Sequence, residues 1–144
     1  MEDDMRGANF EGENLIGADL IGRNLAGVNL ADANLTGVDL TDGDLSEAEL
    51  INVDLTGAIL KGAKLNGADL SGANLTVATL TNADLTRTNL SKANLYAANL
   101  TGANLSNAIL VDAVLTDAVL TGAKLIGTDL TGAIGVELTD AILE

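Results

Sequence analysis

The sequence predicts an all-β solenoid, in which the chain coils around one axis and each coil stacks on the one before. Leu recurs at every fifth position from Leu15 to Leu130, and Phe10 keeps the same register. Ala usually stands two residues before each Leu, and Asn or Asp usually stands immediately before it. The chain has one Phe, one Tyr and no Trp, so its core must be narrow enough for Leu and Ala to fill.

A period of five fits neither a helix nor an unbroken strand. Positions five apart spiral around a helix and form no apolar stripe. In a strand, alternate side chains share a face, so Leu70 and Ala68 point inwards together while Asp69 points outwards. The next Ala, Ala73, has the wrong parity for the same strand. The backbone must therefore turn once per unit, at the two residues after Leu, where Gly, Thr, Ser, Asn and Asp are frequent.

The backbones of stacked coils are expected to pair at the usual strand spacing of about 4.8 Å. Nearly every N–H group is then needed, because an unpaired donor in a dry interior is unfavourable. The chain contains no Pro, which agrees with this demand. The spacing of the repeats does not fix the corner angle, so it leaves open how many units make one coil.

The repeated unit, seen most clearly from Ala68 to Thr76, resembles the pentapeptide-repeat family, and the resemblance extends from Met5 to about Ala133. It implies a right-handed, quadrilateral parallel β-helix with four pentapeptides per coil and about six coils. Residues twenty apart would then stack. At the usual strand spacing, such a rod is roughly 30 Å long.

We expect a single domain over residues 1–144, with a degenerate first unit at 1–9, regular repeats at 10–133 and a C-terminal cap at 134–144. The register breaks at Gly135, where a Leu is due, and resumes shifted by three at Leu138 and Leu143. Solenoids need terminal caps, and this apolar segment could fold back over the last coil. At the other end, Glu13 and Arg23 stand at inward positions. Either they pair across the open end as a cap, or both bend out to solvent.

The composition argues against catalysis. The absence of Cys and His excludes thiol chemistry and removes the commonest general base, and a filled prism offers no cleft. We therefore expect no enzyme activity and no cofactor. With a net charge of −14, direct nucleic-acid binding is not expected. The sequence has no apolar run long enough for a membrane segment, and its start lacks a secretory signal. These features predict a cytoplasmic protein or a piece of a longer chain.

Acidic residues concentrate between residues 31 and 60, where no basic residue occurs. Three interpretations stay open: a solvated surface, a docking face for a protein partner with a basic surface, and a Ca²⁺ site, although regular D-x-D-x-D spacing is absent. The residues of the candidate docking face are Asp19, Asp39, Asp42, Asp44 and Glu47.

The outward positions become apolar between residues 109 and 126, and exposure of an apolar band to water is unfavourable. It could lie under the C-terminal segment, or it could form a homodimer contact through the C-terminal coil. The residues of this apolar band are Ile109, Val111, Val114, Val119 and Ile126.

The predicted function is that of a non-catalytic structural or protein-interaction module. The family resemblance implies an alternative, since some members mimic duplex DNA and act on DNA gyrase or related topoisomerases. Two features count against it. The acid is concentrated in the first 60 residues, and those relatives tend to carry Phe at the unit centre, where this chain has only Phe10.

Overall fold

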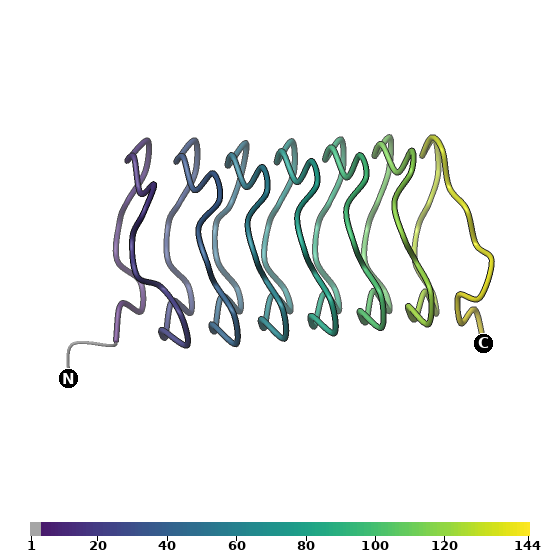
Figure 1. The fold of residues 1–144 in the computed structure, drawn as a ribbon, viewed down its shortest axis with the longest axis horizontal. Helices are drawn as coiled ribbons and strands as arrows, with labels where there is room; N and C mark the ends of the chain where they lie inside the picture. Colours follow the sequence, from purple (N-terminus) through teal and green to yellow (C-terminus); the bar gives the residue numbers. More distant parts are fainter. Residues whose placement is uncertain (1–3) are drawn as a thin grey trace.

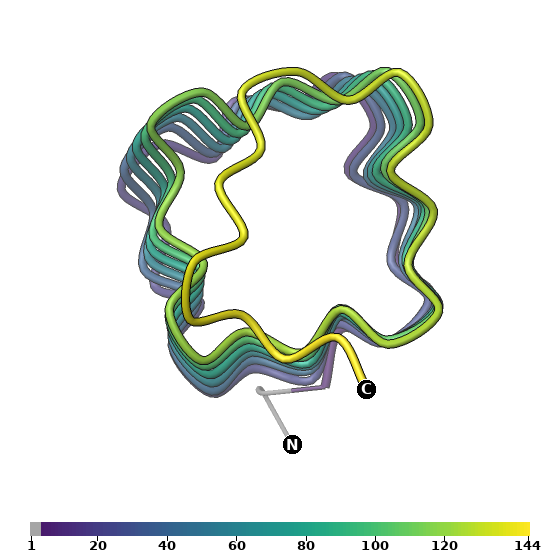
Figure 2. The same ribbon diagram turned by 90° about the vertical axis from the view of Figure 1, so that its right-hand side faces the viewer.

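The computed structural model describes residues 4–144, which form a four-sided rod. The coils stack along the long axis, with the first described residues and the C-terminus at opposite ends (Figure 1). Seen from the C-terminal end, the chain turns anticlockwise as it approaches the viewer, so the coil is right-handed (Figure 2). The described residues contain no helix, and hence none that could cross a membrane. Isolated parallel β-bridges join the coils.

All of the bridges except the last, Lys124 to Ile142, connect residues twenty apart, so that four five-residue units make one coil. Asp69, for example, bridges Glu49 in the preceding coil and Asn89 in the following one. The regular register from Asp4 to Ile134 makes between six and seven coils, close to the prediction.

The bridge positions define four walls, which are numbered in chain order. Wall 1 carries Asn9, Asn29, Glu49, Asp69, Asn89, Ile109 and Asp129. Wall 2 carries Asn14, Asn34, Asp54, Asn74, Asn94, Val114 and Ile134. Wall 3 carries Asp39, Ile59, Thr79, Asn99 and Val119. Wall 4 carries Asp4, Asn24, Asp44, Lys64, Asp84, Asn104, Lys124 and Ile142.

The predicted Leu and Ala axis forms the core. Leu50, Leu70 and Leu90 are at most 1% exposed, and the small residues two positions earlier line the same interior. Similar side chains stacked in register fill the centre densely. Thr88 replaces one inward Ala and is fully buried, but its hydroxyl donates to the carbonyl of Leu85 and so has a partner.

Four of the five N–H groups in a typical unit bond to backbone carbonyls. Two donate to the next coil, one donates to the previous coil, and one closes the corner. In the unit centred on Leu70, these bonds are Leu70 to Asn89 (2.7 Å), Gly72 to Ser91 (2.9 Å), Asp69 to Ala48 (2.9 Å) and Ala68 to Leu65 (2.9 Å).

The fifth N–H group belongs to the residue after Leu, and a side chain accepts its hydrogen bond. Asn74 Oδ1 accepts the N–H of Thr76 at 3.1 Å and the Thr76 hydroxyl at 2.6 Å. This Asx turn recurs along the rod, from Asn9 to Asp129. The sequence pattern indicated only that Asn and Asp point outwards. The structure shows that they also fold back and satisfy the corner.

Substitutions at Asn94 test this role of the side chain. Asn94 accepts the Tyr96 N–H at 3.0 Å, and its wall neighbours Asn74 and Val114 are uncharged. Asn94→Ala removes the acceptor and should lower the free energy of unfolding by about 1–2 kcal/mol. Asn94→Asp keeps the acceptor and should stay within about 0.5 kcal/mol of the parent. Urea denaturation at neutral pH measures both, and equal losses would contradict the assignment.

After Ile134 the chain leaves the wall. The C-terminal segment, yellow in Figure 2, crosses inside the square outline before it returns to a wall. It rejoins wall 4 two residues earlier than the spacing of twenty requires, because Lys124 bridges Ile142 and not residue 144. The Leu125 N–H also donates to the Ile142 carbonyl at 2.8 Å. Val136 and Ala141 pack against the core, whereas Leu138 and Leu143 are exposed. The capping role of this segment stays a prediction.

Gly135 permits this crossing. Its φ is +70°, and a Cβ atom there would lie 2.5 Å from Thr116 Cα and 2.6 Å from Thr116 N. Gly57 has a similar φ of +66° but open space around it. Any larger residue is therefore strained at both positions, but only at Gly135 does it also collide with backbone.

The pair Gly135→Ala and Gly57→Ala separates the two effects. Gly57→Ala should cost about 1 kcal/mol of stability from backbone strain alone. Gly135→Ala should cost more, and should also speed amide hydrogen exchange at Gly122 and Leu125, whose N–H groups bond to the terminal segment. Unchanged exchange at these two amides would show that the crossing does not depend on Gly135.

Candidate interaction surfaces

A cavity lies at the N-terminal end of the rod and not in a wall. Its volume is about 260 Å³. It forms where the inner side chains of the first coil have no regular coil beneath them. Asp19 is its only charged lining residue, so it offers no acid–base pair for catalysis. The lining residues are Met5, Phe10, Leu15, Ala18, Asp19, Leu20, Leu25 and Leu30.

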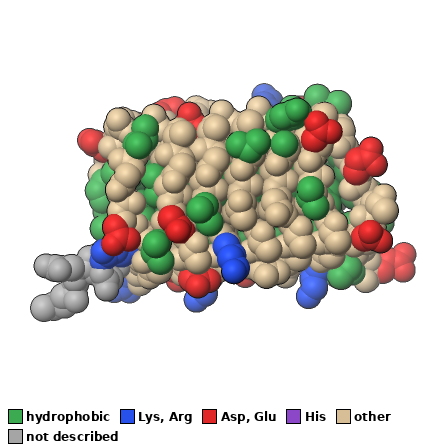
Figure 3. Space-filling view, in the orientation of Figure 1, with side chains coloured by type: hydrophobic (Ala, Val, Ile, Leu, Met, Phe, Trp, Pro, Cys, Tyr) green, Lys and Arg blue, Asp and Glu red, His purple; other side chains and the backbone are tan. Residues whose placement is uncertain are grey.

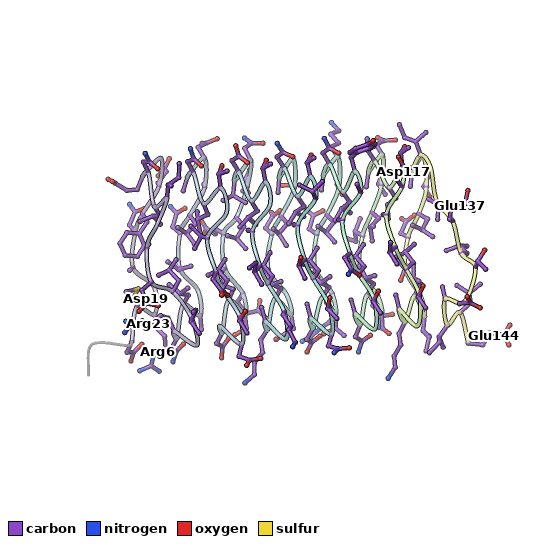
Figure 4. All side chains as sticks on the ribbon, in the orientation of Figure 1. Arg6, Asp19, Arg23, Asp117, Glu137 and Glu144 are labelled. Carbon is purple, nitrogen blue, oxygen red and sulfur yellow. The ribbon has the colours of Figure 1, made fainter. Side chains whose placement is uncertain are left out.

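Arg23 lies beside this cavity and contacts Asp19, as Figure 4 shows at the N-terminal end. Its Nε donates to the Asp19 carbonyl at 3.3 Å, and its guanidinium lies 3.9 Å from the Asp19 carboxylate. Among the described wall positions, Asp19 alone forms no bridge. Glu13 is exposed, and its predicted capping pair with Arg23 stays a prediction. The repeat pattern did not point to Asp19 as the partner of Arg23, because it places Asp19 at an outward position and Arg23 at an inward one.

The predicted acidic residues form a band around one part of the rod. Asp39 lies on wall 3 and Asp44 on wall 4, with Asp42 on the corner between them. Glu47 follows on the next corner, and Asp19 lies one coil nearer the N-terminus. These five residues are called the acidic band below. In Figure 3, where wall 3 faces the viewer, carboxylates lie toward the two ends of the face.

Two carboxylates of the acidic band are oriented by hydrogen bonds from the corner residues that follow them in the chain. The Thr41 hydroxyl and N–H both donate to Asp39, and these bonds lower the pKa of that carboxyl below its ordinary value of 3.8. The Ser46 hydroxyl lowers the pKa of Asp44 in the same way, aided by the Ser46 N–H and by Lys64 in the next coil. Both carboxylates are therefore ionised and oriented at neutral pH.

The calcium interpretation has no site to support it, because no three acidic side chains within residues 4–144 come close enough together to ligate a metal ion. The acidic band is spread over two walls and two corners, and it leaves its carboxylates apart.

The residues of the apolar band run around the rod and do not gather on one face. Ile109 lies on wall 1, Val114 on wall 2 and Val119 on wall 3. Val111 and Ile126 follow Leu residues. Ile109, Val119 and Ile126 are exposed, whereas Val111 and Val114 are half-buried. Their predicted role in capping or dimerisation stays a prediction.

The sequence matches the family model of pentapeptide repeats over residues 4–42, 14–50, 40–76, 68–107 and 98–134. No curated protein matches it.

Solved structures of such repeats are similar to this chain. HetL from the cyanobacterium Nostoc sp. strain PCC 7120, described as involved in regulation of heterocyst differentiation, is 32% identical with a TM-score of 0.54. The match covers 96% of this chain and 78% of HetL. A pentapeptide repeat protein from the Arabidopsis thaliana thylakoid lumen is 36% identical with a TM-score of 0.51. This match covers 76% of the present chain and 70% of the Arabidopsis protein.

The pKa of Asp39 provides a test of the oriented carboxylates. Because the pKa is lowered in the folded state, ionised Asp39 contributes stability above its ordinary pKa, and this contribution is lost as the pH falls through the folded pKa. Thr41→Val removes the hydroxyl donor and should move the pKa of Asp39 back toward 3.8. NMR titration of the carboxyl carbon measures this shift. Thr81→Val, at a corner with no such carboxylate, is the control and should leave the pKa unchanged.

Proposed function

This chain belongs to the pentapeptide-repeat family, and we propose that it acts as a non-catalytic protein-interaction module. The observation that carries the proposal is the filled axis. Leu and Ala side chains occupy the centre from Leu20 to Leu125, so the walls contain no room for a substrate. The same packing makes the walls rigid, and a rigid surface loses little conformational entropy when it binds. HetL, a family member described in terms of regulation, is compatible with such a role.

The partner that suits the acidic band is a protein with a basic surface. A net charge of −14 steers cationic surfaces toward the rod over long range. At contact, Asp39 and Asp44 present carboxylates already fixed by Thr41 and Ser46. Fixed charges favour specificity and association rate, because they need not be ordered during binding.

The DNA-mimicking alternative fits this surface less well. A mimic of duplex DNA needs acidic groups along the rod, but the four wall 3 positions from Ile59 to Val119 are uncharged. On wall 4, Lys64 and Lys124 interrupt the acidic positions. The acid therefore forms a local band and not a continuous track.

Neutralising the acidic band tests the proposed partner chemistry. The band variant combines Asp39→Asn, Asp42→Asn, Asp44→Asn and Glu47→Gln, which keep the corner acceptors while removing four charges. We expect it to bind a Lys-rich peptide at least tenfold more weakly than the parent in low salt, by fluorescence anisotropy.

The matched control also removes two wall carboxylates and two corner carboxylates, but at distant positions: Asp84→Asn, Asp129→Asn, Asp112→Asn and Asp117→Asn. It should lose much less affinity. Equal losses in the two variants would show that only net charge matters and would contradict a localised face. Inhibition of gyrase supercoiling by the parent at low micromolar concentration would favour the DNA-mimicking alternative.

A further inference from the structure

An uncharged face runs along walls 2 and 3 in three adjacent coils. It consists of residues 74–82, 94–102 and 114–122, with Asp117 as its one charged residue. The coils between the N-terminus and residue 70 instead carry several charged residues each, and on residues 31–60 all of these are acidic. In the face turned to the viewer in Figure 3, the middle carries few charged side chains, and a basic side chain lies toward its lower edge. On wall 3, an exposed apolar residue lies at each end of this face. Ile59, in the coil that borders the face on its N-terminal side, is 39% exposed, and Val119, in its last coil, is 44% exposed.

Val77 lies on the edge between walls 2 and 3 and is unfavourable for an isolated rod. Its φ is +51°, and it is the only β-branched residue among the described non-glycine residues with positive φ. Such a conformation is strained for a β-branched side chain. Equivalent corners elsewhere carry residues such as Gly57 or Asn82, which tolerate it better. Val77 is also 52% exposed, so an apolar side chain is held in a strained corner and in water.

We propose that this uncharged face binds a second copy of the chain, with wall 3 against wall 3 and the two rods antiparallel. Two copies with a net charge of −14 repel each other, and the repulsion is smallest where the facing surfaces carry no charge. The order of residues on wall 3 is also self-complementary. A two-fold axis between Thr79 and Asn99 places Ile59 of each copy against Val119 of the other, as an isologous contact requires.

The polar and edge residues fit the same axis. Thr79 faces Asn99 of the second copy, and both are uncharged hydrogen-bonding side chains. At the edge, Val77 faces Ala97 of the second copy, so the strained apolar corner meets another apolar corner. Both positions lie in the coils nearest the axis.

Charge decides between antiparallel and parallel rods. A parallel pair would place Asp39 against Asp39 of the second copy, and Asp19 against Asp19. Like charges held directly opposite each other at an interface are strongly unfavourable. In the antiparallel pair, Asp39 instead lies opposite the segment after Gly135. That segment carries Glu137 and Asp140, but it is set back inside the outline of the rod, so these charges do not meet Asp39 directly (Figure 2).

The size of the contact sets the expected strength. Four coils at about 4.8 Å per step give a narrow strip of wall, which belongs to the smallest class of specific interfaces. The dimer should therefore be reversible and should dissociate on dilution to about 1 μM, while it forms near 1 mM. High salt should preserve or strengthen it, since it screens the remaining repulsion. Binding of a basic partner should instead weaken in high salt. The salt dependence therefore distinguishes the dimer from the complex with a basic partner, and either proposal can be wrong without the other.

Sedimentation velocity of the full chain between about 1 μM and 1 mM tests the proposal. The parent's mean mass should rise from 14.6 kDa toward twice that value. Ile59→Asp should weaken association at least tenfold and keep the fold, because Asp is common at this repeat position and accepts the corner N–H. The matched control is Ile109→Asp, which has the same repeat position on wall 1 and a 43% exposed parent residue, and it should dimerise normally.

A parent that stays monomeric throughout overturns the proposal. So does loss of association in Ile109→Asp but not in Ile59→Asp, which would place the contact in the apolar band around the C-terminal coil.

A charge-swap variant tests the antiparallel arrangement. The double variant Ile59→Asp with Val119→Lys places opposite charges together in antiparallel rods and should restore dimerisation at low salt. In parallel rods it would place like charges together, so a failure to restore would overturn this arrangement.

Val77→Asn should raise the melting temperature of the monomer by relieving strain and should weaken association several-fold. Unchanged association in the Val77→Asn variant would show that the edge between walls 2 and 3 is not part of the dimer contact.

Discussion

The demand that every backbone N–H find a partner constrains the rest of this structure. In a regular unit, three N–H groups bond to neighbouring coils, one closes the corner through a carbonyl, and one closes it through Asn or Asp. The interior is packed mainly with Leu and Ala, and its buried polar side chain, Thr88, already donates to the Leu85 carbonyl. A single unit of four or six residues among the five-residue units would shift the bonds between coils out of register. The uniform length of the units is therefore enforced by hydrogen bonding as much as by packing of the leucines.

This constraint explains which features the sequence could predict. The spacing of Leu70 and its neighbours required a common axis, because no helix or continuous strand gathers positions five apart. The corner angle could not be predicted from spacing, since the turn residues at Gly72 or Asn82 permit several geometries. It came only from the family resemblance. The closing role of Asn74 was missed, although its signal was present as Asn or Asp followed two residues later by Thr or Ser. The contact between Arg23 and Asp19 had no such signal, because the repeat pattern places Arg23 inwards and Asp19 outwards.

The same constraint gives inward and outward positions different roles. Inward residues repeat almost without change, since the stack accepts few sizes and shapes. Outward residues are free to vary once the corner is closed, as the series Asp39, Ile59 and Thr79 on wall 3 shows. Specificity in such a rod therefore depends on the order of residues along each wall.

Wall 3 carries both proposed surfaces, with the acidic band at its N-terminal end and the uncharged face beyond Ile59. The two do not compete, because antiparallel pairing about an axis between Thr79 and Asn99 leaves each acidic band outside the contact. It also places the two bands at opposite ends of the dimer. A basic partner with two binding sites could then engage both bands at once, and the second contact would be made at a high effective concentration. A weak dimer and a modest electrostatic contact would in this way combine into tight binding, which neither surface of the single rod could provide.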